Sequence, residues 1–168
     1  SESTHPTTQD LLSYIHASPT PIHCVAESAR RLEMAGFQSL DPGSAWDLES
    51  GQGYWLSRRG TLIAFRMGTE ACADAGFRIV GAHTDSPNLR VKPVADTGAN
   101  GYLQLGVETY GGLLDYTWLD KDLGLVGSVM LQGAGPIPEE HLVRIDRPIL
   151  RIPSLAIHLN REIRTDGL

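Results

Sequence analysis

The stretch from Phe77 to Pro87 constrains the fold of this chain more than any other. Residues 77–81 form a mostly apolar run of the kind that a buried β-strand requires, and the chain becomes polar immediately afterwards. In an open α/β sheet, ligands bind just beyond the carboxyl ends of the strands. Pro87 has no N–H group, so we expect the strand to end before it. The stretch therefore predicts a strand of an α/β sheet that ends at a ligand-binding edge.

Two of the polar residues in this stretch, His83 and Asp85, suit a metal site. An imidazole can offer one ring nitrogen to a metal ion. A carboxylate two residues later lies on the same side of the chain, where it can accept the other N–H or approach the ion itself. The pair alone is a weak motif, because many such neighbours at strand ends are only hydrogen-bonded to each other.

The number of ligands is the difficulty for a metal site, since a catalytic zinc requires three protein ligands and an open position. The other acidic and histidine candidates show no tight metal-ligand spacing with a second residue. These candidates are Glu108, Asp115, Asp120, Asp122, His141, Asp146 and His158. A serine nucleophile at Ser86 is an alternative, although no Gly-x-Ser-x-Gly turn accompanies it.

The composition of the 168 residues is that of a globular protein, with 41% hydrophobic and 20% charged residues. The net charge of −6 and the absence of a Lys/Arg cluster argue against nucleic acid as a partner. No apolar run approaches the ~20 residues of a membrane span, and the first residues do not form a leader sequence. Two cysteines with no pairing signal, Cys24 and Cys72, are expected to be free thiols in a reducing compartment, so we expect a cytoplasmic protein.

The first part of the chain alternates between helical and strand patterns. We expect a helix that begins with Thr7 as its cap, and a second helix over about residues 22–35 that ends at a left-handed Gly36. Residues 54–58 and 61–66 read as a β-hairpin, and residues 89–94 as a strand near an edge. These elements predict a first, α/β module over residues 1–94.

Helical periodicity disappears after the turn-rich joint at residues 96–101. The later β-type segments cover residues 103–108, 123–131, 142–145, 149–152 and 155–159, with breaks expected at Pro148 and Pro153. A second, β-rich module is therefore expected over residues 95–168. Two helices are thin cover for the sheet of the first module, and the chain ends without an element that closes either module.

Four stretches together resemble the aspartyl aminopeptidase family, a group of cytosolic two-metal exopeptidases. They occur in the order found in that family, and they cover residues 81–93, 106–112, 117–127 and 142–159. The resemblance implies an α/β fold: residues 1–94 would be the N-terminal part of a zinc-peptidase-like catalytic domain. Residues 95–168 would be the β-rich dimerisation domain inserted in that catalytic domain, and we expect it to be incomplete.

The resemblance also implies an activity and a set of partners. The family removes N-terminal Asp and Glu residues from peptides with a water activated by two Zn²⁺ ions, other divalent metals being alternatives. It assembles as a homo-oligomer of dimers, a dodecamer. His83 matches the first metal ligand of the family and Asp85 the carboxylate that orients this histidine. His158 resembles a histidine that reaches the active site of a neighbouring subunit, where it helps to hold the substrate or the developing oxyanion.

The other metal ligands and the general base of that family have no counterpart among these 168 residues. We therefore expect the full-length protein to be a zinc-dependent aminopeptidase, and the chain on its own to be inactive. Two alternatives stay open: an inactive short paralogue that acts as an assembly or binding subunit, and an unrelated small hydrolase built around Ser86.

Overall fold

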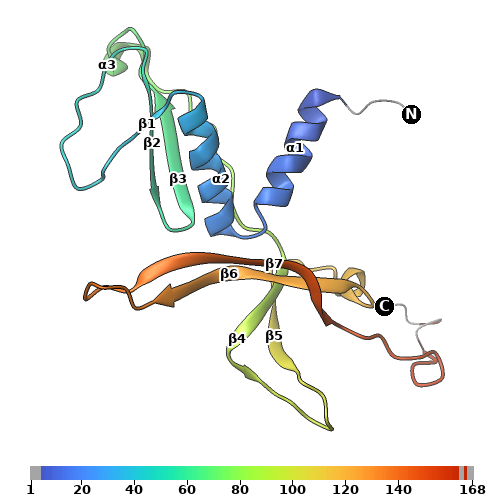
Figure 1. The fold of residues 1–168 in the computed structure, drawn as a ribbon. Helices are drawn as coiled ribbons and strands as arrows, with labels where there is room; N and C mark the ends of the chain where they lie inside the picture. Colours follow the sequence, from blue (N-terminus) through green and yellow to red (C-terminus); the bar gives the residue numbers. More distant parts are fainter. Residues whose placement is uncertain (1–4, 163–164, 166–168) are drawn as a thin grey trace. The chain divides into compact units, whose positions relative to one another are not determined.

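The computed structural model describes residues 5–162 and residue 165, and these residues form a mixed α/β protein. Residues 1–85 and 127–142 make up one compact unit, and residues 86–126 and 143–168 make up a second (Figure 1). Each unit is described by itself below. Of the helices in the described part of the chain, none is both long and apolar enough to cross a bilayer.

Two helices open the first unit: α1 (Pro6–Ala17) and α2 (Pro21–Met34). Each begins with a proline, whose fixed φ and missing N–H suit the first helical position. Thr20 caps α2, where its hydroxyl accepts from the N–H of His23 at 3.4 Å. Gly36, with φ +80°, follows the end of α2 in the left-handed conformation that the sequence predicted. The predicted cap at Thr7 is wrong: the cap of α1 is His5, two residues earlier, and its ring accepts from the N–H of Thr7.

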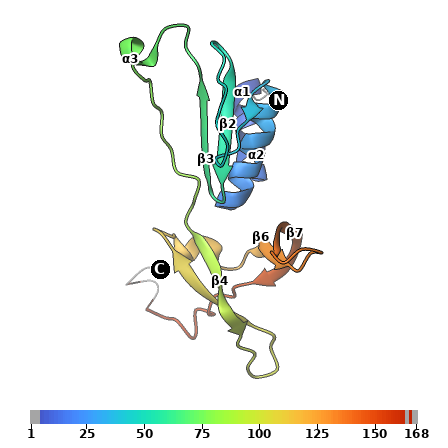
Figure 2. The ribbon, with the colours of Figure 1, turned by 90° about the vertical axis from the view of Figure 1, so that its left-hand side faces the viewer.

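The sheet of the first unit has three strands in the order β1-β2-β3. These are β1 (Gln38–Ser39), β2 (Gly53–Arg58) and β3 (Thr61–Arg66). β1 runs parallel to β2, and β2 pairs antiparallel with β3, as the hairpin prediction required. The turn between β2 and β3 places Arg59 at φ 54° and is completed by Gly60. Helix α2 lies beside this sheet (Figure 2). The buried apolar residues of the described chain are Cys24, Val25, Tyr54 and Trp55.

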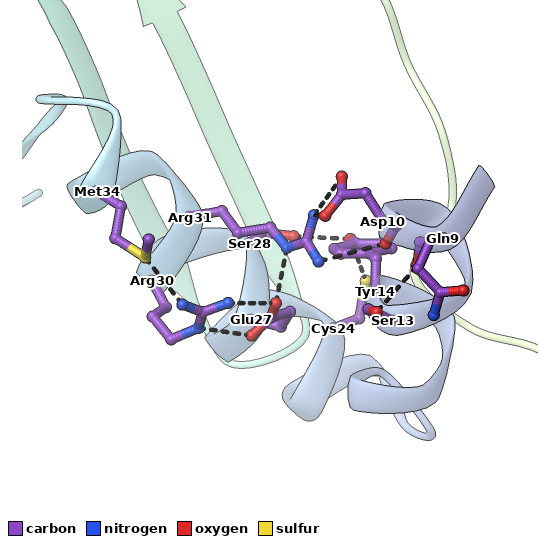
Figure 3. Close-up of polar contacts among 10 residues, drawn as sticks. All are labelled: Gln9, Asp10, Ser13, Tyr14, Cys24, Glu27, Ser28, Arg30, Arg31 and Met34. Carbon is purple, nitrogen blue, oxygen red and sulfur yellow. Dashed lines mark hydrogen bonds and ion pairs between the residues drawn. The ribbon is translucent and has the colours of Figure 1, made fainter. Parts of the chain in front are cut away.

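Polar contacts join α1 and α2 (Figure 3). The guanidinium of Arg31 donates to the carboxylate of Asp10 at 2.8 Å and to that of Glu27 at 2.7 Å, and it lies over the ring of Tyr14. Arg30 donates to both carboxylate oxygens of Glu27. The hydrogen bonds from Arg30 and Arg31 lower the pKa of Glu27 to about 2. An ionic network of two arginines and two carboxylates therefore fixes the helix pair.

The apolar run at residues 77–81 does not form the buried strand that the sequence predicts. It follows the short helix α3 (Cys72–Ala75), and the side chains of Phe77, Ile79 and Val80 are 78%, 87% and 97% exposed. A strand buried on both faces needs hydrogen-bonded neighbours and covering layers. In the described part of the first unit, the sheet consists of β1, β2 and β3 alone and does not include residues 77–81. The strand prediction is therefore wrong for this chain as it stands.

The second unit is built from paired strands. β4 (Asn88–Asp96) and β5 (Leu105–Tyr110) pair antiparallel with an irregularity between Val91 and Asp96, and the 3₁₀ helix η1 (Asp115–Trp118) follows. β6 (Asp122–Leu131) and β7 (Glu139–Arg151) form a two-stranded sheet, of which residues 127–142 belong to the first unit.

Two expectations for this part are wrong. β7 continues through Pro148, because a two-stranded sheet leaves each strand an edge on which a missing N–H costs nothing. Residues 155–159 form a turn rather than a strand, since the carbonyl of Ala156 accepts from the N–H of Leu159 at 2.8 Å.

The second unit leaves its apolar side chains incompletely covered. None of its described residues is buried. A groove of about 630 Å³ lies between the two strand pairs of this unit, and its apolar lining includes Leu105, Val107, Trp118, Leu125 and Ile152. These side chains form a surface that a further layer of protein would cover favourably.

Candidate metal centre

His83 and Asp85 lie on an extended segment that follows α3 in the first unit. Nδ1 of His83 is 3.0 Å from Oδ1 of Asp85 and 2.7 Å from the backbone carbonyl oxygen of the same residue. Both partners are acceptors, so the tautomer that satisfies them carries its proton on Nδ1 and its lone pair on Nε2. The ring is 81% exposed. The pair therefore has the arrangement of a metal-binding histidine and its orienting carboxylate, with Nε2 available.

Thr84 holds this segment against the sheet of the first unit. Its hydroxyl donates to the carbonyl of Gly60, in the turn between β2 and β3, at 2.8 Å. Thr84 and Asp85 are both half-buried, whereas residues 81–83 before them and Ser86 after them are exposed. Sequence reasoning missed this anchor, because a threonine between a histidine and an aspartate carries no signal of its own.

The remaining candidate ligands do not gather around His83. Within residues 5–162 and 165, no group of three or more His, Cys, Asp or Glu side chains could hold a metal ion. His141 lies near Glu139, with its Nε2 3.6 Å from that carboxylate, and Asp146 accepts from Arg144. The described residues thus bring together one candidate ligand and one neighbouring carboxylate, and they do not complete a zinc site.

His158 belongs to the second unit, in the turn that replaces the expected strand. Its side chain is exposed, and the carbonyl of Ala156 closes the turn around it by accepting from the N–H groups of Leu159 and Asn160. The ring is thus presented to solvent by a backbone that is locally hydrogen-bonded.

The chain matches a family model described as aminopeptidase I zinc metalloprotease (M18) over residues 14–167. The chain belongs to the M18 family of zinc aminopeptidases. It is 51% identical over 161 residues to a probable M18 family aminopeptidase 2 of Streptomyces coelicolor, covering 96% of this chain and 36% of that protein. It is 43% identical over 162 residues to a probable aspartyl aminopeptidase of Ricinus communis, covering 94% of this chain and 33% of that protein.

Solved structures of M18 enzymes share the fold. The chain aligns with a subunit in a cryo-EM structure of the Ape4 and Nbr1 complex with a TM-score of 0.89 and 43% identity, over 95% of this chain and 31% of that one. It aligns with a subunit of the Saccharomyces cerevisiae mApe1 dodecamer with a TM-score of 0.80 and 33% identity, over 91% of this chain and 36% of that one. The chain spans about a third of the length of the curated relatives it matches.

Membership of the M18 family decides between two of the chemistries that the sequence left open. The family is one of zinc metalloproteases, so a hydrolase built around Ser86 loses its support. The His83 ring and the Asp85 carboxylate fit part of a zinc site, because an imidazole with a carboxylate on its second nitrogen is a common zinc ligand. The ligand role of His83, the orienting role of Asp85 and the role of His158 stay predictions.

Proposed function

We propose that this chain acts as part of an M18 zinc aminopeptidase that removes acidic residues, Asp or Glu, from the N-termini of peptides. Residues 1–94 would contribute the first part of the catalytic domain, and residues 95–168 would contribute to a dimerisation domain. His83 would bind one of two Zn²⁺ ions, and Asp85 would orient its ring. The other ligands and the general base would come from polypeptide outside these 168 residues.

The observation that carries this proposal is the His83–Asp85 contact in a chain of this family. The Asp85 carboxylate lies 3.0 Å from Nδ1 of an exposed His83 ring, and a contact of this kind orients many metal-binding histidines. A single imidazole does not retain Zn²⁺, since catalytic zinc sites use three protein ligands. The chain alone is therefore expected to be inactive, and an inactive assembly subunit is the alternative that the same observation leaves.

The uncovered apolar side chains support a role for the second unit in assembly. A groove lined by Leu105, Val107, Trp118, Leu125 and Ile152, in a unit without a buried described residue, gains favourable burial when a second copy covers it. One relative of known structure is a dodecamer. We propose a homo-oligomer built from dimers, in which His158 reaches the substrate bound to a neighbouring subunit. The cytoplasm, where Cys24 and Cys72 would stay reduced, is the proposed compartment.

The test uses a longer M18 chain that contains this sequence. Hydrolysis of Asp- and Glu-p-nitroanilides is compared with that of the Leu and Ala analogues, and bound zinc is counted by atomic absorption. We expect a preference for the acidic substrates and two zinc ions per subunit. His83→Ala should lose activity together with bound zinc, whereas the matched control His141→Ala should keep both. Full activity of His83→Ala would refute the metal site.

The inactive alternative has its own outcome in this test. If the longer chain binds no zinc and cleaves none of the four substrates, but still assembles, the assembly-subunit function replaces the enzymatic one. A preference for Leu or Ala over Asp and Glu would keep the aminopeptidase and remove the acidic specificity.

A further inference from the structure

Asp120 makes three contacts with the chain that leads to His158. Asp120 lies between η1 and β6, and its N–H donates to the carbonyl of Ile152 at 2.8 Å. Its carboxylate accepts from the N–H of Ser154 at 3.2 Å and, in a short hydrogen bond, from the Ser154 hydroxyl. One residue therefore binds both sides of Pro153.

Pro153 explains why such a contact is needed at this point. Pro153 has no N–H to donate to a strand ladder, and β7 ends at Arg151, two residues before it. A single parallel bridge joins Leu119 to Ile152 just beyond the strand. The backbone of Asp120 uses the last acceptor before the proline, and its carboxylate uses the first donor after it. The hydrogen bonds of Asp120 on either side of Pro153 thus take the place of the strand pairing that has ended there.

The residue type at position 120 fits this task. Asp120 adopts φ 55°, in the left-handed region that Asp and Asn tolerate better than other non-glycine residues. The hydrogen bonds from Ser154 lower the pKa of the Asp120 carboxyl, and the nearby guanidinium of Arg151 acts in the same direction. The group is therefore an anion at neutral pH, and charged acceptors make the stronger hydrogen bonds. Asp122 also pairs with Arg151, at 3.2 Å, and among the described residues it makes no hydrogen bond with Ser154.

Ser154, the residue that the Asp120 carboxylate binds, lies close to His158 along the chain. Residues 154–160, which we name the His158 arm, begin at Ser154 and end with the turn closed on the carbonyl of Ala156. Three residues lie between Ser154 and His158, so the Cα of His158 lies within about 14 Å of the Cα of Ser154 even in a fully extended chain. The arm is exposed apart from Asn160, which is half-buried. Few described side chains other than Asp120 are therefore in a position to restrict it.

We propose that Asp120 is a positioning residue: its carboxylate clamps Ser154 and thereby holds the arm that presents His158 to a bound substrate. This inference rests on the function proposed above for His158. Asp120 itself touches no reacting group in this scheme. Its contribution is to reduce the conformations that the arm samples before a substrate arrives, which lowers the entropic cost of placing the imidazole.

The first part of the test measures the arm directly in the 168-residue chain. Amide hydrogen exchange, followed by NMR, is compared for Ser154, Leu159 and Asn160 in three variants. Asp120→Gly keeps the backbone conformation without the carboxylate, and it should speed exchange at Ser154 about tenfold, as expected for the loss of one charged hydrogen bond. Asp120→Asn keeps an acceptor and should be intermediate. Asp122→Asn, the matched control, should leave these amides unchanged. Unchanged exchange in Asp120→Gly would overturn the clamp.

The second part measures catalysis in the longer M18 chain, where a double-mutant comparison separates positioning from general damage. Asp120→Gly should lower kcat about tenfold with zinc content and oligomer mass unchanged. In a background that already carries His158→Ala, the same substitution should cost nothing further, because two residues that act as one unit are not additive. Losses of kcat that add in the double variant would overturn the positioning role alone. So would an Asp120→Gly protein with full kcat, if His158→Ala lowers kcat. Full activity of His158→Ala would instead overturn the proposed function of that histidine, and the positioning role with it.

Discussion

The ionic network between α1 and α2 allows one prediction to be worked out in detail. Glu27→Gln removes a carboxylate whose pKa is lowered from 4.5 to about 2 by hydrogen bonds from Arg30 and Arg31. A shift of this size corresponds to at most ~3.5 kcal/mol of folding free energy. The carboxylate is only 12% exposed, but the Arg30 side chain is 55% exposed, and solvent screens its share. We therefore expect the substitution to cost about 1–2 kcal/mol at pH 7.

The pH dependence of this cost follows from the direction of the shift. A carboxyl whose pKa is lower in the folded state stabilises the fold above its unfolded pKa, near 4.5, and loses that contribution as the pH falls toward 2. The difference between wild type and Glu27→Gln should therefore be constant from pH 7 to about pH 5 and should shrink steadily below it.

Urea unfolding followed by ellipticity at 222 nm, which reports α1 and α2, measures this difference at pH 7, 5, 4 and 3. Asp10→Asn is the matched control: it removes the other carboxylate bound to Arg31, but Asp10 is exposed, so the cost should stay below about 0.5 kcal/mol. A Glu27→Gln protein as stable as wild type at pH 7, or a cost that does not change between pH 5 and 3, would refute the reasoning.

Three further predictions concern the helix cap, the β6–β7 sheet and the metal ligand. Thr20→Ala removes the hydroxyl that caps α2 and should lower the free energy of unfolding by about 1 kcal/mol in the same urea assay. Gly124→Ala would press a Cβ against the carbonyl oxygen of Ile145, so it should weaken the pairing of β6 with β7 and lower the oligomer mass of the longer chain in light scattering. Gly127→Ala, where a Cβ meets open space, should not. Asp85→Asn should weaken zinc binding in the longer chain by 10- to 100-fold, as judged by competition with a chelator, because the ring of His83 loses its orienting charge.

Elements that are specified locally could be predicted from the sequence. The end of α2 at Gly36 and the turn from β2 to β3 at Arg59-Gly60 were both predicted, because the residues that set them lie within a few positions of the segments they delimit. The pairing partners were less accessible. β1 has only two residues and no recognisable pattern. β7 runs through Pro148, which is tolerated because the strand has an unpaired edge. Local rules could not reveal either.

The candidate site shows the same division. The contact between His83 and Asp85 follows from a two-residue spacing, and the sequence allowed it. The burial predicted for residues 77–81 did not follow, because burial depends on strands and layers from elsewhere in the polypeptide, and the described residues do not provide them. Asp120 was visible in the sequence only as one acid among several, and its contact with Ser154 depends on a fold that brings residues 34 positions apart together.

The exposure of Phe77, Ile79 and Val80 has a practical consequence for handling this polypeptide. An extended, apolar segment with free backbone groups is a template on which another strand can add, whether it comes from the correct neighbour or from an aggregate. Preparations of these 168 residues should bind hydrophobic dyes and precipitate at high concentration. The dye signal should fall when polypeptide that covers residues 77–81 is supplied. The signal therefore reports whether these apolar side chains have become buried.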